Sequence, residues 1–366
     1  MPGGSRDRPL RVALVIGQLS TGGAEGQLWL LCRDHDRTRV QLTVYCLSDQ
    51  TAPYGERLAA SGVAVRVVTG TRLARLRKLR WWLAADHIEV VHAWLFIANG
   101  FAWLASRGAR TPLITSARNC KRQGTMLDLL NRRAFQASVA IVVNSENVGT
   151  YIAEHYAAPR ERMRVIYNAI DTERFRPART NATAVPSLGP IVTVGRLVAQ
   201  KNLDLFLRAA QRLVSDIPGV RFVIVGDGPL RAALEAQAAQ LGIADHVVFT
   251  GERADVEAVL QGASLFWLTS LWEGLPNVVL EALASGVPAV ATDVGGTREL
   301  IRSGVDGFIV ASDDLDGLVR HSRQLLSDTA MRHRFQLAAR ARAEEFSVTQ
   351  MAGAYMRLYE EAVGAR

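Results

Sequence analysis

The sequence is poor in the features that mark secreted, disulfide-bonded and membrane-spanning proteins. Its 366 residues include three cysteines, which lie far apart and form no CxxC pair: Cys32, Cys46 and Cys120. This spacing argues against a disulfide framework and against a cysteine-based zinc site, and it favours free thiols. No apolar run approaches the ~20 residues that a membrane-spanning helix needs. The first run, Val12–Ile16, is too short for a signal peptide, so we expect a cytoplasmic protein.

Two nucleotide-binding signatures are missing as well. The sequence contains neither GxGxxG nor GxxxxGK[ST], so the dinucleotide-binding and P-loop interpretations lose support. The chain is 49% hydrophobic and 21% charged, which is the composition of a globular protein rather than a disordered one. Its length of 366 residues suits two or three domains.

Lysine is scarce, and the basic residues are unevenly distributed. Residues 1–180 hold 26 Lys+Arg and 14 Asp+Glu, a net charge of +12, whereas the remainder carries −4. A basic half suggests an anionic partner: a membrane surface, a phosphorylated acceptor or nucleic acid. Aromatic stacking platforms and nucleic-acid reader motifs are absent, so we expect no nucleic-acid partner.

Peripheral contact with an anionic membrane is left open by two basic clusters. The stretch Arg72–Arg80 mixes five basic residues with leucines. It fits a membrane-surface helix or, as we favour, a domain helix with solvated arginines. The second cluster comprises Arg118, Lys121, Arg122, Arg132 and Arg133.

Short segments rich in Val and Ile alternate with helical stretches in two series, which predicts two parallel sheets with helices on both sides. The first series comprises Arg11–Ile16, Val40–Cys46, Val63–Val68, Ile88–His92, Leu113–Thr115 and Val139–Asn144. The second comprises Ile191–Val194, Arg221–Val225, His246–Phe249, Ser264–Leu268, Val287–Ala291 and Gly307–Val310. A linker rich in Pro, Ala, Ser and Thr separates them at residues 176–190. We predict an α/β protein with doubly wound, Rossmann-like domains at 1–177 and 178–346, and a helix at 347–366 that could pack back on the first domain.

Ligands of open α/β sheets bind beyond the carboxyl ends of the strands, and glycine-rich turns follow several of the expected strands. Gly22 and Gly23 fit either a phosphate contact at a helix start or a tight turn. Gly226 belongs to a strand-to-helix turn that, by itself, is more typical of structure than of a site. His92 ends a strand and has two interpretations: an acceptor contact or general base facing the cleft, or a buried histidine with satisfied nitrogens.

Two cations at the start of the second domain predict a diphosphate site. Gly195 and Arg196 end its first strand, and Lys201 lies at the start of the next helix. Arginine binds two phosphate oxygens through its forked guanidinium, while lysine acts as a point charge. The alternative is a pair of solvated cations at a helix start.

The most specific pattern of the chain is a pair of carboxylates at a loop-to-helix junction. Glu273 and Gly274 follow an apolar strand, a helix begins near Asn277 and Val278, and Glu281 lies one turn inside it. Backbone N–H groups at that helix start favour anionic or hydroxyl-rich ligands, and both carboxylates can accept hydrogen bonds from a polyol. The alternatives are a capping role for Glu273 and a surface position for Glu281. A glycosidase acid–base pair is discounted because a phosphate-type site lies beside it.

Together these motifs resemble the retaining glycosyltransferases of family 4, which have the GT-B architecture of two Rossmann-like domains facing across a cleft. The resemblance covers nearly the whole chain. It rests on Gly22-Gly23-Ala24-Glu25, Asn168-Ala169-Ile170-Asp171, Gly195-Arg196 with Lys201, Gly226-Asp227-Gly228-Pro229, Glu273-Gly274-Leu275-Pro276-Asn277 with Glu281, and Gly295-Gly296.

The resemblance implies a nucleotide-sugar site in the C-terminal domain and an acceptor site in the N-terminal domain. As catalytic residues, Arg196 and Lys201 would neutralise the leaving diphosphate, and Glu273 would hold the donor sugar. The implied donor-binding residues are Gly22, Gly23, Gly195, Gly226, Gly274, Asn277, Val278 and, for the ribose hydroxyls, Glu281. No metal or other cofactor is implied, and in retaining members the departing phosphate is often proposed to take the acceptor proton.

The sequence departs from the family pattern at the acceptor side. In many members a histidine follows the strand that Leu113–Thr115 matches, whereas here Arg118 holds that place, next to Asn119. Both residues are acceptor-side candidates with His92, and an arginine suits an acceptor that bears phosphate or carboxylate. Ala169 replaces the glycine of the commoner Asn-Gly joining motif.

The resemblance implies an enzyme that moves a sugar from a UDP- or GDP-linked donor to a glycan or lipid-linked acceptor, in the assembly of cell-surface polysaccharide or glycolipid. A lipid-linked acceptor would place it at the inner face of the cytoplasmic membrane. One alternative is a nucleotide-sugar epimerase or another GT-B enzyme, against which the Glu273 and Glu281 block speaks. The second is a non-catalytic nucleotide-sugar-binding protein, against which the intact Arg196 and Lys201 speak.

Overall fold

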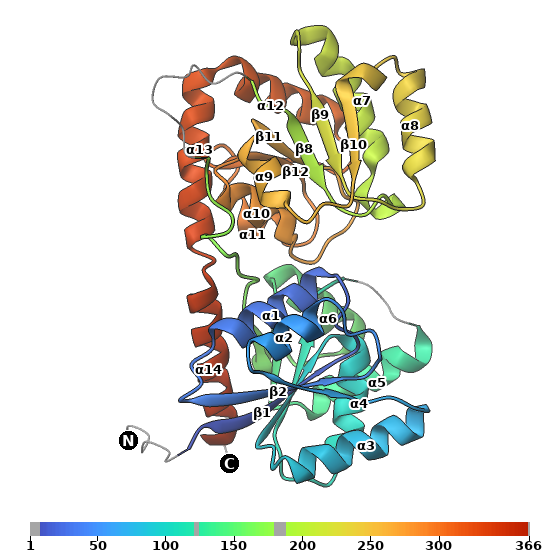
Figure 1. Cartoon of the computed structure of the whole chain (residues 1–366), viewed down its shortest axis with the longest axis vertical. Coiled ribbons are helices and arrows are strands. Elements are labelled where there is room, and N and C mark those ends of the chain that lie inside the picture. Colours follow the sequence, from blue (N-terminus) through green and yellow to red (C-terminus); the bar gives the residue numbers. More distant parts are fainter. Residues whose placement is uncertain (1–7, 121–123, 179–187, 365–366) are drawn as a thin grey trace. The chain divides into compact units, whose positions relative to one another are not determined.

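The chain divides into two units, each built on a parallel sheet (Figure 1). The structure is a computed structural model that describes residues 8–120, 124–178 and 188–364. Unit 1 comprises Met1–Ala169 and Val348–Arg366, and unit 2 comprises Ile170–Ser347. No helix within the described ranges is both long and apolar enough to cross a membrane. Two members of the second basic cluster, Lys121 and Arg122, fall outside these ranges.

Unit 1 contains a seven-stranded parallel sheet in the order β3-β2-β1-β4-β5-β6-β7. The strands are β1 (Leu10–Ile16), β2 (Val40–Cys46), β3 (Ala64–Val67), β4 (Val90–Trp94), β5 (Leu113–Ala117), β6 (Ala140–Val143) and β7 (Met163–Val165). The helices are α1 (Gly23–Asp34), α2 (Tyr54–Ala60), α3 (Arg72–Ala85), α4 (Phe96–Ser106), α5 (Thr125–Ala137), α6 (Glu146–Tyr156), the 3₁₀ turn η1 (Arg160–Arg162) and α14 (Val348–Gly364). The strand order reverses between β1 and β4, and such a switch point is where ligands of this fold bind.

The central strand β1 explains why unit 1 has helices on both faces of its sheet. Val12, Leu14 and Ile16 pack in one apolar cluster with residues of α1 and α14, whereas Ala13 and Val15 pack in another with residues of α3 and α4. Successive side chains of a strand point to opposite faces, so a strand that is apolar at every position needs cover on both sides.

The helix α14 is part of this core although it lies at the far end of the sequence. Tyr355, Met356, Leu358 and Tyr359 are buried in the cluster that contains Val12. Figure 1 draws α14 in red, with the blue β1 and β2 in the same unit. Unit 1 is therefore completed only when the chain has passed through unit 2.

Unit 2 contains a six-stranded parallel sheet in the order β10-β9-β8-β11-β12-β13. The strands are β8 (Ile191–Val194), β9 (Phe222–Val225), β10 (Val247–Gly251), β11 (Leu265–Leu268), β12 (Ala289–Thr292) and β13 (Gly307–Val310). The helices are α7 (Leu203–Asp216), α8 (Arg231–Gln240), α9 (Val256–Gln261), α10 (Asn277–Ala284), α11 (Thr297–Leu300), α12 (Leu315–Ser327) and α13 (Thr329–Glu344), with the 3₁₀ turns η2 (Ala199–Lys201) and η3 (Ala244–His246). Its switch point lies between β8 and β11.

All twelve expected strands are present, with ends shifted by no more than two residues. The sequence analysis missed β7, a three-residue edge strand whose centre is the exposed Arg164. The expected free thiols are confirmed, since Cys32, Cys46 and Cys120 are all unpaired.

The division between the units differs from the boundaries set by sequence. It lies after residues 169 and 347, whereas the linker composition had placed it after residues 177 and 346. The chain joins unit 2 earlier because Arg340 of α13 donates to the carbonyl oxygens of Thr172 and Phe175, at 3.1 and 2.9 Å.

The basic helix α3 has the geometry of the domain-helix interpretation. Leu79 and Leu83 are buried against the sheet, while its basic residues remain half-buried or exposed. Leu73 and Trp81 are 57% and 64% exposed, so the outer face is not purely polar. Contact with a membrane stays a prediction.

The helix α14 offers a direct test of how unit 1 is stabilised. We expect Leu358→Ala to destabilise unit 1 by about 2–5 kcal/mol, because it removes a buried side chain and leaves a cavity. The neighbouring Arg357→Ala, which changes an exposed residue of the same helix, should cost less than about 0.5 kcal/mol. Hydrogen exchange of the β1 amides measures both changes, and equal protection in the two variants would contradict the assigned packing.

Candidate functional site

Two strand ends of unit 2 approach each other so closely that glycine is required. Gly226, after β9, has φ +131°, and a Cβ there would overlap the carbonyl oxygen of Gly195. The Gly195 N–H donates to the Val225 carbonyl (2.9 Å), and the Gly226 N–H donates to the Gly251 carbonyl (2.8 Å). The loops after β8, β9 and β10 therefore meet at the carboxyl edge of the sheet.

At this edge the two predicted catalytic residues Lys201 and Glu273 contact each other. Lys201 Nζ lies 2.6 Å from Glu273 Oε1, and Ser270 Oγ donates to the same oxygen at 2.8 Å. Thr269 Oγ1 donates to the Lys201 carbonyl (2.8 Å), which fastens the end of β11 to η2. The two charged side chains are only 18% and 11% exposed, so their attraction is less screened than that of a surface pair.

Arg196, the third predicted catalytic residue, is different in being exposed. It directly follows Gly195 at the end of β8, and its guanidinium has no hydrogen-bond or ion-pair partner among the residues that the structure describes. This edge therefore presents one cation engaged with Glu273 and one that is available.

The start of α10 is held in place by a second glycine turn. The Gly296 N–H donates to the Gly274 carbonyl at 2.7 Å. Gly295 has φ +54°, and a Cβ there would overlap the same carbonyl oxygen. Asn277 and Val278 form the first turn of α10, whose N–H groups have no acceptor within the helix and favour an anion.

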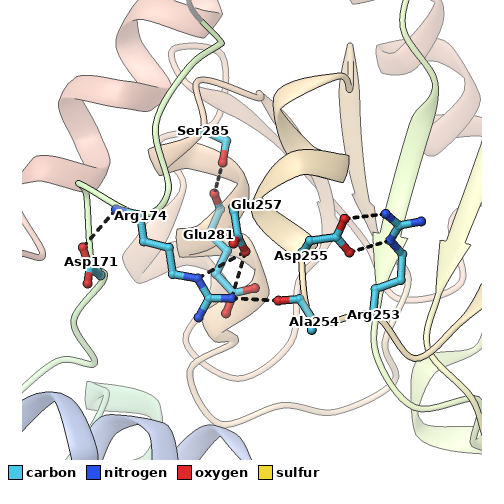
Figure 2. A network of polar contacts seen from close by, with 8 residues as sticks. All are labelled: Asp171, Arg174, Arg253, Ala254, Asp255, Glu257, Glu281 and Ser285. Carbon is cyan, nitrogen blue, oxygen red and sulfur yellow. Dashed lines mark hydrogen bonds and ion pairs between the residues drawn. The ribbon is translucent and has the colours of Figure 1, made fainter.

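Glu281 lies further along α10 beside a second polar network (Figure 2). The residue is partly exposed. Burial raises its pKa to about 7; the positive charge of Arg174 opposes this shift and the carboxylate of Glu257 adds to it. Glu281 thus differs from the fully solvated helical glutamate of its alternative interpretation.

In unit 1, the turn predicted to contact phosphate already holds a carboxylate. Gly22 is the N-cap of α1, and Gly23 is the first residue of that helix. The carboxylate of Glu25 folds back over the helix start, so that a Cβ at Gly22 would overlap it. Glu25 is buried; burial raises its pKa, against hydrogen bonds to its own backbone and Gln18 and the charge of Arg118. A carboxylate at a helix N-terminus interacts favourably with the helix dipole, as a bound anion would.

Arg118 is enclosed within unit 1 rather than free. Its Nη2 donates to the Tyr355 hydroxyl (2.5 Å) and its Nη1 to Asn168 Oδ1 (2.8 Å), and its guanidinium lies 4.0 Å from the centre of the Trp94 ring. Arg118 is 7% exposed and its Nε lacks a partner, as does Oδ1 of the adjacent Asn119. The side chain expected on the acceptor side is therefore held by three neighbours and keeps one unpaired donor.

His92 has the geometry of the second of its two interpretations. The ring has no exposed surface; Nδ1 is 2.8 Å from the Tyr359 hydroxyl and Nε2 is 2.7 Å from Ser116 Oγ. Burial, together with the charge of Arg118, lowers its pKa to about 3. In this structure the ring is neutral, satisfied on both sides, and offers no surface to an acceptor.

Comparison with known proteins decides the family. A model of glycosyltransferase family 4 matches residues 21–174, and a model of glycosyl transferases group 1 matches residues 188–342. A D-inositol 3-phosphate glycosyltransferase of Salinispora arenicola is 30% identical over 318 residues, which are 77% of this chain and 70% of that protein. The chain belongs to the family 4 glycosyltransferases.

Two further matches place this family 4 glycosyltransferase among its relatives. The UDP-Gal:alpha-D-GlcNAc-diphosphoundecaprenol alpha-1,3-galactosyltransferase of Escherichia coli is 30% identical over 201 residues, 52% of this chain and 52% of that protein. The chain therefore spans about half the length of that relative. The crystal structure of Anabaena HepE in complex with UDP has a TM-score of 0.85 at 22% identity, covering 96% of this chain and 100% of that one. With the two strand orders, this likeness confirms the expected GT-B fold.

The site of the family 4 glycosyltransferase falls into two sets of predicted residues. In unit 2 the structure brings to one sheet edge Gly195, Arg196, Lys201, Gly226, Glu273, Gly274, Asn277 and Val278, with Glu281 deeper along α10. In unit 1 the set comprises Gly22, Gly23, His92, Arg118 and Asn119. Sequence reasoning missed the partners that fix them, above all Ser270, Arg174, Glu257 and Tyr355, because isolated polar residues carry no pattern that marks such contacts.

The expectation that the enzyme needs no metal stays a prediction. Among residues 8–120, 124–178 and 188–364, no group of three or more His, Cys, Asp or Glu side chains is arranged to hold an ion. The contacts of the site are thus made by arginine, lysine, carboxylates and backbone amides.

The buried His92 makes the stability of unit 1 sensitive to acid. The folded-state pKa of about 3 lies below the ordinary value of 6.5, so the folded state binds fewer protons than the unfolded state. The contribution to stability is complete above pH 6.5 and is lost as the pH falls toward 3. Between pH 7 and pH 5 we expect a loss on the order of 2 kcal/mol from this residue alone.

The measurement compares wild type with His92→Gln, whose amide can still bond to both neighbours but does not titrate. In wild type, the unfolding free energy of unit 1 should fall between pH 7 and pH 5. In His92→Gln this fall should be smaller by about 2 kcal/mol. The same acid sensitivity in both proteins would show that the His92 ring is not kept neutral by the fold.

Proposed function

We propose that this chain transfers a sugar from a nucleotide-sugar to a glycan or lipid-linked acceptor, with retention of the anomeric configuration. The observation that carries the proposal is the arrangement at one sheet edge of the shielded Lys201–Glu273 pair, the exposed Arg196 and the start of α10. A cation pair beside a helix N-terminus stabilises the negative charge that grows on a departing diphosphate.

In this proposal unit 2 binds the donor. Arg196 and Lys201 bind the diphosphate, with the first-turn N–H groups of Asn277 and Val278 directed at the same oxygens. Glu273, already fixed by Ser270, accepts hydrogen bonds from hydroxyls of the donor sugar. Glu281 accepts them from the ribose. The E. coli relative is named for UDP-Gal and the Anabaena structure is a complex with UDP, which favours a UDP-linked donor over a GDP-linked one.

Unit 1 binds the acceptor, and the step needs no side-chain nucleophile. As the bond between the sugar and the phosphate breaks, the leaving phosphate oxygen takes the proton of the attacking acceptor hydroxyl on the same face of the sugar. Arg196 and Lys201 lower the energy of this step because they contact the oxygens on which charge develops. No metal ion is required for the charge balance of this scheme.

The acceptor and its location follow from the relatives and from the surface of unit 1. The E. coli relative is named for a diphosphoundecaprenol-linked acceptor, which supports a role in polysaccharide or glycolipid assembly. Such an acceptor would bring the enzyme to the cytoplasmic face of a membrane. The exposed basic residues and Trp81 of α3 form the segment that we propose for that contact.

Donor binding is the first property to measure. Titration calorimetry with UDP, GDP and ADP should show binding of one of the first two. Loss of a charge-assisted contact costs about 1.5–3 kcal/mol, so Arg196→Ala and Lys201→Ala should each weaken binding about 10- to 150-fold. Arg208→Ala, which removes an exposed ion pair with Asp204, is the matched control and should bind as wild type. Absence of binding by all three nucleotides would contradict the proposal.

Retention can be tested without knowing the acceptor. Slow hydrolysis of the bound UDP-sugar releases a free sugar whose anomeric signals are resolved by proton NMR before mutarotation. We expect the donor's α configuration to appear first, and Glu273→Gln to slow the release by about 100-fold or more. Initial release of the β anomer would mean an inverting enzyme.

A further inference from the structure

A guanidinium that the donor scheme does not use lies next to Glu281. Arg174 follows the chain's entry into unit 2, and its backbone N–H donates to Asp171 Oδ1 at 3.0 Å. Its Nε and Nη2 both donate to Glu257 Oε2, at 3.2 and 2.8 Å, and Nη2 also donates to the Ala254 carbonyl at 3.2 Å. Figure 2 shows this network with the Glu281 side chain beside the guanidinium.

Glu281 has no hydrogen bond to its carboxylate from any residue in the described part of the chain. The charged or titratable groups on the described segments packed around α10 are Arg174, Glu257 of α9, Arg298 and Glu299 of α11, the Lys201–Glu273 pair, and Arg332, His333, Arg334, Arg340, Arg342 and Glu344 of α13. Among them, the charge of Arg174 lowers the pKa of Glu281 and that of Glu257 raises it. Arg340 instead donates to backbone carbonyls, including that of Ala284 at 2.9 Å.

The arrangement sets one guanidinium between two carboxylates. A carboxylate accepts hydrogen bonds from a ribose diol most strongly when it is ionised. A carboxylate that has lost part of its hydration ionises more readily where a nearby positive charge compensates for the loss. Because Arg174 already forms an ion pair with Glu257, its compensation of Glu281 is partial.

We propose that Arg174 is a positioning residue of the donor site, which permits Glu281 to ionise and bind the ribose diol of a nucleoside diphosphate, and that Glu257 limits this effect. The inference rests on the proposed function for the identity of the ligand. The charge relation between Arg174, Glu257 and Glu281 is a property of the free protein and does not depend on it.

The direction of each effect follows from the charges. In wild type the pKa of Glu281 is about 7, so its ionised fraction rises through neutral pH. Replacing Arg174 by Gln removes the compensating charge and raises the pKa of Glu281. Replacing Glu257 by Gln removes the competing carboxylate and lowers it. Each shift should be about one pH unit or more, as expected for a charge at close range.

The first experiment follows Glu281 in the free protein. Carbon NMR of ¹³C-labelled glutamate, with Glu281→Gln to assign the signal, gives its titration midpoint in wild type, Arg174→Gln and Glu257→Gln. Asp255→Asn is the matched control, because it removes a carboxylate from the same loop whose partner is Arg253 rather than Arg174. We expect the Glu281 midpoint to move to higher pH in Arg174→Gln and to lower pH in Glu257→Gln. It should stay unchanged in Asp255→Asn.

The second experiment joins this titration to binding. If only the ionised form of Glu281 binds ribose, UDP affinity should rise about tenfold between pH 6 and pH 8 beyond the change seen in Glu281→Gln, which retains the titration of the phosphate. This rise should move to higher pH in Arg174→Gln and to lower pH in Glu257→Gln.

The outcomes separate the two proposals. Equal Glu281 midpoints in wild type, Arg174→Gln and Glu257→Gln would overturn the positioning role, whatever binds. Shifted midpoints without UDP or GDP binding would overturn the proposed function and leave the charge relation standing. If Arg174→Gln does not fold, the direction of the shift in Glu257→Gln decides the question.

Discussion

The ion pair between Lys201 and Glu273 joins the two loops on which the donor side of this enzyme depends. One loop follows β8 and the other follows β11, and these strands are neighbours across the switch point of the unit 2 sheet. Their backbones are fastened by Thr269 and by the hydrogen bond from the Leu271 N–H to the Gln200 carbonyl (2.8 Å). Since both side chains are shielded from water, removing either would leave a poorly hydrated charge. A diphosphate that binds beside Lys201 therefore provides a second anion for the same shielded ammonium group.

Unit 1 also contains a shielded cation, but the groups that contact it are uncharged. It places a cation, Arg118, in a nearly closed environment and surrounds it with the Trp94 ring, the Asn168 amide and the Tyr355 hydroxyl. Tyr355 belongs to α14, so the residue that replaces the expected family histidine is fixed by the last helix of the chain. The neutral His92 lies in the same aromatic cluster, 5.6 Å from the Tyr355 ring. The charge of Arg118 is thus surrounded by uncharged groups, whereas that of Lys201 is paired with the carboxylate of Glu273.

Much of this could be predicted from sequence because the signals are local. Runs such as Val90–Trp94 and Leu265–Leu268 are apolar at nearly every position, as strands covered on both faces must be. Glycines that follow such strands, including Gly195 and Gly226, mark the sheet edge where ligands bind. The same signals predict that Lys201 and Glu273 lie at this edge, where the structure has them. Their mutual contact could not be predicted, because no local pattern joins residues so far apart.

The remainder depended on contacts that sequence does not encode locally. Composition indicates a linker at residues 176–190, yet unit 2 already begins at Ile170, because Arg340 donates to the carbonyl groups of Thr172 and Phe175. His92 allowed two interpretations because the sequence indicated a strand end there, and this was wrong: β4 continues to Trp94, so His92 lies at its centre. Only the positions of Ser116 and Tyr359 distinguish them. Arg174 carried no signal of its own, since an arginine after a turn is ordinary on any surface.

The distribution of charge shows why net charge alone is a poor guide to this site. Residues 181–366 carry a net charge of −4, although the proposed donor site lies among them. At the loops after β8 and β11, the cations Arg196 and Lys201 outnumber the carboxylate Glu273. Because electrostatic forces fall off over about 8 Å at physiological salt, a diphosphate responds to this local excess of positive charge rather than to the balance of the whole half.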